Sequence, residues 1–421
     1  MKKRIMAGML AMAILVTACN VQKANGQVSN TNAVDSPKEQ ELARGFKLKI
    51  DGEIGPMFLE KIDTSKQSVH TDLVRELSSE MTKGDDGSCY YFRKEGKGKK
   101  LKLVFYKNNG IKVCETTMEE SIKKKYYIRS FVKYGSRFFL AFDRRGYDDY
   151  DDGILTTIDM ETGEWGNIIE APEFYWDMMV YEDCFYCKDV NDNITRYDLS
   201  GERTELEKVA SKKFTQSIQC IVDGKIYYVV DKCEHAYDKT KVKVMRSNLD
   251  GSDIETLFTY NSEWGGLAYV EGDLQIDGDY MYLKGKFGKV RCLARIPLYG
   301  GRVEKIAAKT GSYELSEDGI FFRKGNYIYK LNKNLRGKPK DVTKLYYPAS
   351  LTIYADPWHY ADGHLMMQGY NKKEHKVVDD ILHDISWDWD IYIDVKETYA
   401  DDYYWVNKNG KVEDVIEGSG I

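Results

Sequence analysis

The chain of 421 residues has few of the features that mark a catalytic or metal centre. It holds 6 His and no HExxH, G-x-S-x-G or P-loop pattern, so zinc-protease, α/β-hydrolase and nucleotide-hydrolase chemistry have no support in its motifs. It has only 7 Pro but 32 Tyr, a composition that is typical of β structure rather than of disorder.

The cysteines give little support for a disulfide framework or for a metal or redox site. Of the 8 Cys, setting Cys19 aside leaves seven, an odd number, so at least one has no partner within the chain. Cys184 and Cys187 form a CxxC pattern, but the surrounding CFYC is expected to be a strand. Strand alternation points these two side chains to opposite faces, which favours buried apolar roles over metal or redox chemistry.

Long hydrophobic runs are absent, and the longest, residues 5–16, is too short to span a bilayer. It follows Lys2, Lys3 and Arg4, which is the pattern of a signal peptide. Val16-Thr17-Ala18-Cys19 resembles the lipobox of bacterial lipoproteins, in which the Cys becomes the acylated N-terminus. The resemblance implies a signal peptide over 1–18, lipidation of Cys19 and an extracytoplasmic protein anchored to the membrane; an ordinary secretory signal is the alternative.

Residues 19–44 are polar and nearly free of large apolar side chains, which predicts a flexible tether. The folded part is then 45–421. Without Lys2, Lys3 and Arg4 the chain has 59 basic residues against 67 acidic ones, a net charge of −8. A mildly acidic protein of this kind argues against nucleic acid as a partner.

Seven tight turns with similar flanks recur along residues 108–410, at intervals of about 50 residues, which indicates an internal repeat. Gly, Asn and Asp supply the positive φ that such hairpins need. The turns are Asn108-Asn109-Gly110, Glu161-Thr162-Gly163, Ser200-Gly201, Asp250-Gly251, Gly300-Gly301, 334–337 and Asn409-Gly410.

An expected aromatic or apolar strand lies upstream of each turn, and a weaker strand precedes it. The main strands cover 89–92, 138–142, 184–187, 226–230, 280–283, 320–322 and 365–367. Four strands per unit predict an all-β chain folded as a β-propeller, with seven four-stranded blades; six and eight blades remain alternatives. Residues 45–84 are only partly assigned: 68–81 has the spacing of a short helix, while part of 46–62 could complete the last blade and close the ring.

Two of the repeats carry a family resemblance. The segments 226–231 and 245–252, IYYVVD and MRSNLDGS, resemble the motif of YWTD and TolB-like propellers, and 295–301 and 196–201 are degenerate copies. The resemblance implies a low-density-lipoprotein-receptor-like propeller over roughly 85–417, of a kind that occurs in bacterial lipoproteins of unknown function. The Trp-Thr pair of the motif is missing here, and fold alone does not imply function.

The longer loops, by contrast, are expected at one end of the propeller. In three of the expected blades the loop between the second and third strands is expanded, at 144–153, 232–241 and 370–385. Insertions on one face are where repeat proteins usually bind their partners. The candidate ligand-binding residues at this end are Asp148, Asp149, Asp151, Asp152, Trp176, His235, Tyr237, Trp264, Trp358 and His359.

Two chemistries are open for these residues. Asp149-x-Asp151-x-Gly153 begins like a calcium loop but lacks the third acidic residue before Gly that the EF-hand pattern has. Calcium at Asp149 and Asp151 therefore competes with a solvated acidic loop. Exposed Trp and Tyr beside carboxylates suit sugar rings, although propeller interiors bury Trp routinely. Lys and Arg at 94–100 and 284–291 give the same face a mixed sign, which suits a protein or glycan partner.

These observations predict a lipid-anchored propeller that binds a protein or carbohydrate at the cell surface. A polysaccharide-active enzyme with an Asp or Glu pair in a central funnel is the second hypothesis, since a glycosidase needs just two suitably spaced carboxylates. An envelope-assembly or structural role is the third. No catalytic residue is singled out, and no cofactor besides calcium is expected.

Overall fold

In the computed structural model the chain forms two units, 1–40 and 41–421, and all that is described below belongs to the second. The described residues are 46–421 except 59, 71, 74–80, 97–99, 109, 119–121, 123–125, 145–152, 172–173, 190–192, 207–214, 232–240, 262–273, 288–289, 326, 344–350, 353–356, 372–401, 410 and 417–421. None of the helices among these residues has the length and apolar character needed to cross a membrane.

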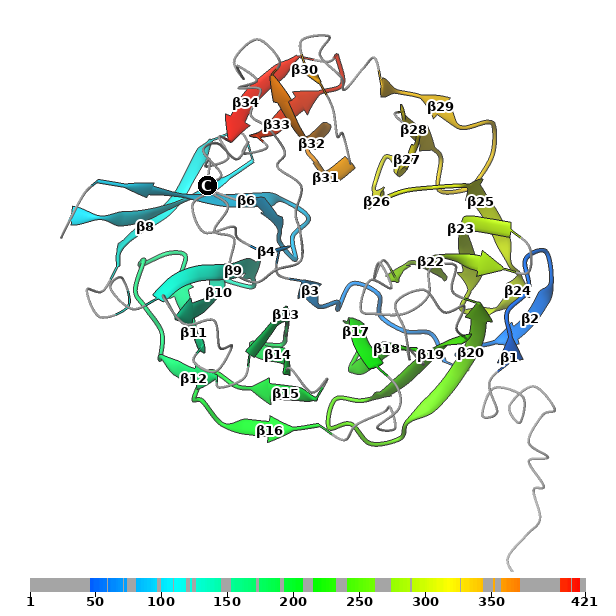
Figure 1. Cartoon of the computed structure of the whole chain (residues 1–421), viewed down its shortest axis with the longest axis horizontal. Coiled ribbons are helices and arrows are strands. Elements are labelled where there is room, and N and C mark those ends of the chain that lie inside the picture. The colour runs from blue at the N-terminus through cyan, green and yellow to red at the C-terminus, as the bar shows by residue number, and fades with distance from the viewer. Residues whose placement is uncertain are drawn as a thin grey trace, which may run out of the picture. The chain divides into compact units, whose positions relative to one another are not determined.

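Within this unit, seven antiparallel blades follow one another around a ring, each with four strands that we name a to d from the inside outward (Figure 1). Blade 1 is β5 Met81–Lys83, β6 Cys89–Glu95, β7 Lys102–Lys107 and β8 Ile111–Thr117. Blade 2 is β9 Tyr126–Tyr134, β10 Arg137–Arg144, β11 Gly153–Asp159 and β12 Ile169–Ala171. Blade 3 is β13 Phe174–Tyr181, β14 Cys184–Asp189, β15 Ile194–Tyr197 and β16 Arg203–Glu205.

Blades 4 and 5 share one sheet, because Asn261 pairs with Lys286 across them. They comprise β17 Thr215–Val222, β18 Lys225–Asp231, β19 Lys241–Asn248 and β20 Glu255–Asn261; then β21 Gln275–Asp277, β22 Tyr280–Phe287, β23 Val290–Pro297 and β25 Glu304–Ala308. Blade 6 is β26 Tyr313–Ser316, β27 Gly319–Lys324, β28 Tyr327–Leu331 and β29 Lys340–Asp341. Blade 7 is β31 Pro357–Ala361, β32 His364–Asn371, β33 Asp402–Asn407 and β34 Val412–Ile416, with β30 Leu351–Thr352 also on β32.

The predicted all-β propeller with seven blades is therefore confirmed. Each of the seven predicted turns joins strands c and d of its blade, and each predicted aromatic or apolar segment is a strand b. In blade 5 the turn is itself paired with β2 through β24 Tyr299–Arg302. It contains Gly300, whose φ of 85° and close approach to Pro56 favour a residue without a side chain.

Hydrophobic clusters fill the spaces between successive blades. Phe105 of blade 1 stacks on Phe138 of blade 2 at 4.2 Å, and Phe139 meets Phe185 of blade 3 at 5.0 Å. Cys184 and Cys187 fall in different clusters, on opposite faces of blade 3, as strand alternation predicted. All six described cysteines, 89, 114, 184, 187, 220 and 292, are buried and free of disulfides.

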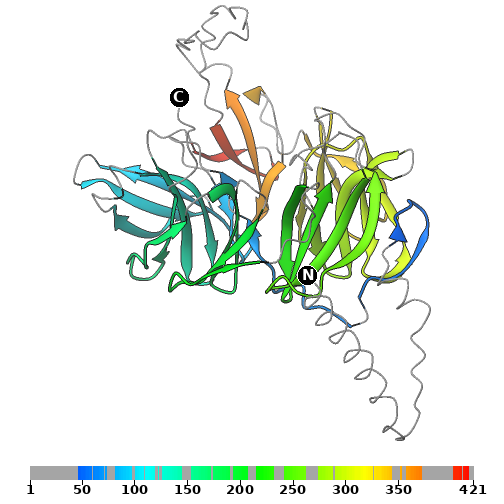
Figure 2. The ribbon, with the colours of Figure 1, turned by 60° about the horizontal axis from the view of Figure 1, so that its bottom comes forward.

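The segment before blade 1 behaves differently from both predictions made for it. It does not complete the last blade: β1 Phe46–Lys47 pairs in parallel with β20 of blade 4, and β2 Glu53–Pro56 pairs with β24 of blade 5 (Figure 2). The predicted helix over 68–81 is also wrong in its described part, because β3 Val69–His70 and β4 Asp72–Leu73 are strands. Both predictions missed that sheet edges offer this segment backbone partners.

From β2 the chain passes to the inner side of the ring, and we call residues 62–73 the inner strap. Ser68 N donates to Ile221 O of blade 4, β3 pairs with β13 of blade 3, and β4 pairs with β9 of blade 2. Gln67 Nε2 donates to Ile276 O of blade 5 at 2.8 Å. The strap thus covers inner edges in four consecutive blades with backbone or amide hydrogen bonds.

Candidate functional site

The two ends of the ring are built differently. Because every blade is an antiparallel meander, its a–b and c–d turns lie at one end, which we call the turn end. The b–c loops and the connections between blades lie at the opposite end, which we call the loop end. The sequence predicts function at the loop end.

The strands place several predicted site residues at that end by topology. Asp148, Asp149, Asp151 and Asp152 follow β10 and precede β11, which makes them part of the b–c loop of blade 2. Similarly, the b–c loop of blade 4 contains His235 and Tyr237, and the connection from blade 4 to blade 5 contains Trp264. All seven lie outside the described residues, so their roles remain predictions.

Trp176 lies in β13, the a strand of blade 3, while Trp358 and His359 lie in β31, the a strand of blade 7. These three residues are described for their backbone only. Cys19 lies outside the described part of the chain. The structure therefore brings the aromatic candidates to strands that border the axis of the ring, and their partners stay a prediction.

A group that sequence reasoning missed lies on blade 1. The rings of Tyr91 and Tyr106 are stacked at 5.2 Å, and the Arg93 guanidinium lies 5.3 Å and 5.4 Å from their centroids. Tyr106 Oη donates to Glu95 Oε1 at 2.6 Å, and this hydrogen bond raises the pKa of Tyr106. Alternation along strand b, with Tyr, Arg and Glu two residues apart, is the signal that could have found it.

At the turn end, carboxylates are used to build turns. Asp198 Oδ1 accepts hydrogen bonds from the Ser200 backbone and hydroxyl at 2.8 Å and 2.7 Å, and Asp250 binds Ser252 in the same way. These bonds lower the pKa of both aspartates. Such side chains shape the backbone, which explains the acidic turns without a ligand.

Other turn-end carboxylates join neighbouring blades. Lys133 of blade 2 is 8% exposed and lies 2.7 Å from Asp85 and 3.7 Å from Asp86 in the a–b turn of blade 1. Asp86 also accepts a 2.7 Å hydrogen bond from Tyr90 Oη. Burial tends to raise the Asp86 pKa, but these donors outweigh it and lower the pKa.

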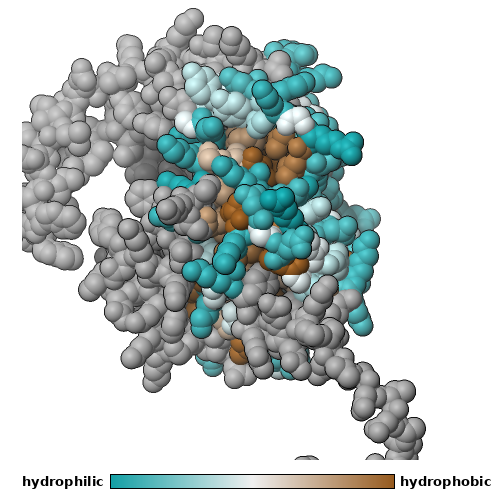
Figure 3. All heavy atoms as spheres, turned by 90° about the vertical axis from the view of Figure 1, so that its right-hand side faces the viewer, coloured by the Kyte–Doolittle hydropathy of each residue, from teal (hydrophilic) through white to brown (hydrophobic). Residues whose placement is uncertain are grey.

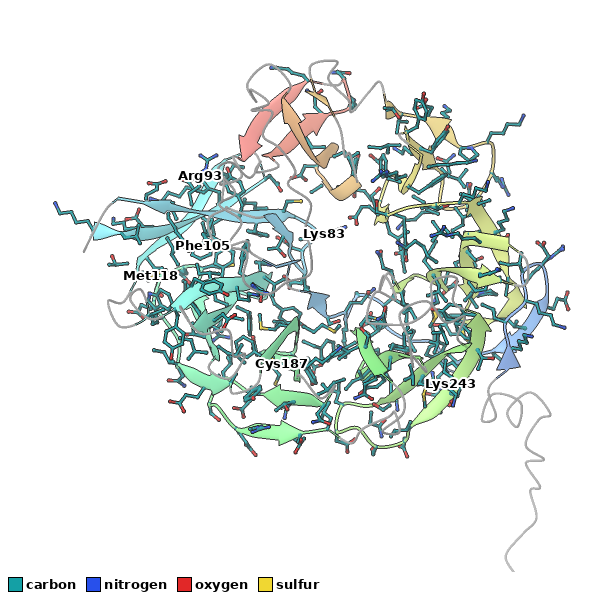
Figure 4. All side chains as sticks on the ribbon, viewed as in Figure 1. Lys83, Arg93, Phe105, Met118, Cys187 and Lys243 are labelled. Carbon is teal, nitrogen blue, oxygen red and sulfur yellow. The ribbon has the colours of Figure 1, made fainter. Side chains whose placement is uncertain are left out.

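One ion pair on the inner side links blades that are not adjacent in the ring. Lys83 Nζ of blade 1 lies 2.5 Å from Glu314 Oε1 of blade 6 and 3.3 Å from Leu315 O (Figure 4). Burial would lower the Lys83 pKa, but the Glu314 carboxylate outweighs it and raises the pKa. The pair therefore holds two blades across the inner side of blade 7.

Among the residues that the structure describes, no three His, Cys, Asp or Glu side chains come together as metal ligands. The predicted calcium segment with Asp149 and Asp151 is outside those residues. Asp198 and Asp85 at the turn end are held by backbone amides, hydroxyls and a lysine of the chain itself.

No family model matches the chain, and no curated protein is similar to it. Solved structures similar in fold include the β-propeller domain of the Trilobed protease from Pyrococcus furiosus, 14% identical over 70% of this chain and 93% of that one, with a TM-score of 0.44. TolB from Acinetobacter baumannii is 9% identical over 67% and 76%, with a TM-score of 0.29. An exo-1,5-α-L-arabinanase from a bovine ruminal library is 12% identical over 67% and 99%, with a TM-score of 0.25.

Proposed function

We propose that this propeller is a lipid-anchored binding module that presents its loop end to a protein or carbohydrate partner outside the cytoplasm. The propeller is the scaffold, and the loops between its blades supply the contacts. Acylation at Cys19 ties the chain to the membrane, and residues 20–44 act as the tether. The lipobox-like Val16-Thr17-Ala18-Cys19 and the YWTD-like and TolB-like repeats support this assignment.

The observation that carries the proposal is the difference between the two ends of the ring. Charged residues such as Lys133, Asp85 and Asp198 at the turn end are engaged by the chain's own groups. The inner edges of blades 2 to 5 are likewise engaged by the inner strap. The loops between the blades are therefore the part of the propeller that we propose for contact with a partner.

The test is a binding screen with the full chain in a non-ionic detergent, against a glycan array and against proteins extracted from the cell surface. A Tyr237→Ala and Trp264→Ala double variant at the loop end is expected to lose binding at least about tenfold, the effect typical of two aromatic contacts. A Tyr134→Ala and Arg137→Ala control at the turn end should bind like the wild type.

Two results would overturn the proposal. Loss of binding only in the turn-end control would show that the partner binds at the turn end and not at the loop end. Conversion of a polysaccharide into shorter products, abolished by changing one Asp or Glu pair, would favour the enzyme hypothesis instead.

Anchoring has a separate test. We expect wild-type protein to incorporate labelled palmitate and to partition with membranes, and we expect the Cys19→Ala variant to do neither. A Cys19→Ala variant that still carries the label would refute lipidation at this residue.

A further inference from the structure

Charge is distributed very unevenly along this acidic chain. Residues 284–340, which form most of blades 5 and 6, contain 15 Lys and Arg against 4 Asp and Glu, although the whole chain has a net charge of −5. This one segment therefore carries a formal charge of +11. Such an asymmetry creates a local field that attracts anions.

Three parts of this segment converge at the loop end. Lys309, after strand d of blade 5, donates its backbone N–H to Arg291 O at the start of strand c, at 3.2 Å. Two residues later, Gly311 N donates to Arg323 O at the end of strand b in blade 6, at 2.8 Å. These two bonds bring Arg291, Lys309 and Arg323 to one place between the blades.

Basic residues lie opposite each other there, without a carboxylate between them in the strand register. Lys286 and Arg291 are directly opposite on β22 and β23, and like charges in that register are unfavourable. Lys324 is opposite Tyr327 on the next hairpin. No ion pair among the described residues involves Lys286, Lys309 or Lys324.

The four acidic residues of the segment lie elsewhere. Glu304 lies 2.7 Å from Arg295, and Glu314 pairs with Lys83 on the inner side. Glu317 and Asp318 form the a–b turn at the opposite end of blade 6. Among the described residues of this segment, those at the loop end of blades 5 and 6 therefore include basic residues but no acidic one.

Exposure suits this surface to a large ligand. Lys309 and Lys324 are exposed, and Tyr327 beside them is 53% exposed, unusually high for a large hydrophobic side chain in this protein. Seen from the outer side of the ring, hydrophilic residues surround a central group of hydrophobic ones (Figure 3). We call Lys286, Arg291, Lys309, Arg323, Lys324 and Tyr327 the basic surface.

We propose that the basic surface binds an acidic polysaccharide, a chain of sugar rings that bear carboxylates. Lysines supply point charges, the two arginines add to the positive field, and the Tyr327 ring supplies a face for a sugar. This inference rests on the proposed function and narrows it to one class of ligand and one part of the loop end.

A lipid surface fits the basic surface less well. Proteins that dock on membranes by charge usually add several exposed apolar side chains that enter the headgroup region. The other exposed large hydrophobic residues of the described chain, Ile111 and Ile168, belong to blades 1 and 2. Tyr327 therefore has no exposed apolar neighbour of that size on the described parts of blades 5 and 6, and a single ring favours a sugar.

The experiment measures binding of the full chain in non-ionic detergent to polygalacturonate, with neutral dextran as the uncharged comparison. We expect binding to polygalacturonate only, weakening steeply as salt is added. A Lys286→Gln, Lys309→Gln, Lys324→Gln variant is expected to bind about tenfold more weakly, a loss typical of three exposed ion pairs. Tyr327→Ala should weaken binding by a smaller factor while keeping the salt dependence.

The matched control removes three exposed lysines from other blades and from the N-terminal segment: Lys49→Gln, Lys61→Gln and Lys408→Gln. It changes net charge by the same amount and should bind like the wild type. An equal loss of polygalacturonate binding in both triple variants would show that overall charge, and not this surface, determines binding. That result would overturn the proposal.

Two further outcomes also overturn it. One is the absence of polygalacturonate binding, which leaves the proposed function to be judged by the array and by Tyr237 and Trp264. The other is stronger binding to vesicles of equal phosphatidylglycerol and phosphatidylcholine than to polygalacturonate, lost in the lysine variant, because the surface would then serve a membrane.

Discussion

Single residues of the turn end act through the backbone they hold. Asp159 Oδ1 accepts hydrogen bonds from Glu161 N and Thr162 N, and Asp198 and Asp250 hold the corresponding turns of the next two blades. An Asp in or beside the c–d turn of three successive blades is thus explained by turn geometry, since a carboxylate satisfies amides that the hairpin leaves unpaired.

We expect Asp198→Ala to lower the midpoint of thermal unfolding at neutral pH. The turn's hydrogen bonds lower the Asp198 pKa below 3.8, so its stabilisation is present above that pH and is lost as the pH falls through the folded-state pKa. The gap between wild type and variant should therefore close under acid conditions. Asp198→Asn, which keeps the acceptor oxygen, is the control, and a gap independent of pH would contradict the explanation.

The Lys83–Glu314 pair supplies a second test at the residue scale. The two side chains are 30% and 9% exposed, so Lys83→Met leaves a largely buried carboxylate without its cation. We expect a loss of about 2 kcal/mol in the free energy of unfolding, measured by urea denaturation.

Replacing both partners, in Lys83→Met with Glu314→Leu, should recover part of that loss because no charge stays buried. If the double variant is no more stable than Lys83→Met, the unpaired Glu314 carboxylate is not what destabilises the single variant.

At the scale of an element, the segment 46–73 links several blades. It does so by pairing with their strands rather than by adding a strand to the last blade. It begins outside blade 4, crosses to the inner side and pairs there with blades 4, 3 and 2 before it enters blade 1. Met57 and Phe58 are buried on the way, in the cluster between blades 4 and 5.

Phe58 packs among aromatic rings of blades 4 and 5. It is 5% exposed, it meets the rings of Tyr227 and Tyr299 at 6.2 Å and 6.3 Å, and the Arg246 guanidinium lies 4.5 Å from its centroid. We expect Phe58→Ala to cost about 3 kcal/mol of unfolding free energy in urea denaturation. Ile111→Ala, at a side chain 59% exposed, is the control and should change stability little.

On the scale of the whole molecule, the ring closes at blade 7 through contacts on both sides. Asn108 of blade 1 donates to Asp362, and Tyr360 donates to Asp318 of blade 6. Phe321 of blade 6 also stacks on Tyr360 at 4.9 Å. Blades 1 and 7 are each built from consecutive strands, so side chains, rather than a shared strand, complete the ring in the part of the chain that is described.

We therefore expect an Asn108→Ala and Tyr360→Phe double variant to loosen this closure. Each lost hydrogen bond to a carboxylate should cost about 1.5 to 3 kcal/mol. Hydrogen exchange should rise in β31 and β32 before it rises in β18 and β19. Uniform exchange across all blades would contradict a localised weakness, and Tyr327→Phe serves as the control at an exposed ring.

Much of the propeller could be predicted because its repeats are local. Gly251 at positive φ and the aromatic run 226–230 record a turn and a buried strand within a few residues of sequence. The opposite faces of Cys184 and Cys187 follow from the same two-residue period. The loop end was predicted from loop length alone, while its ligand-binding residues remain predictions.

What the sequence by itself determined is the blade, since turn conformation and strand alternation depend on neighbouring residues. Only the tertiary structure decided which strands the segment 46–73 pairs with. Strand pairing uses backbone groups that every residue has, so no side-chain pattern predicts the partner strand. The same holds for Lys83 with Glu314, and for Arg291, Lys309 and Arg323. Residues far apart in sequence meet there because the ring closes, and their charges combine into a surface that no local motif describes.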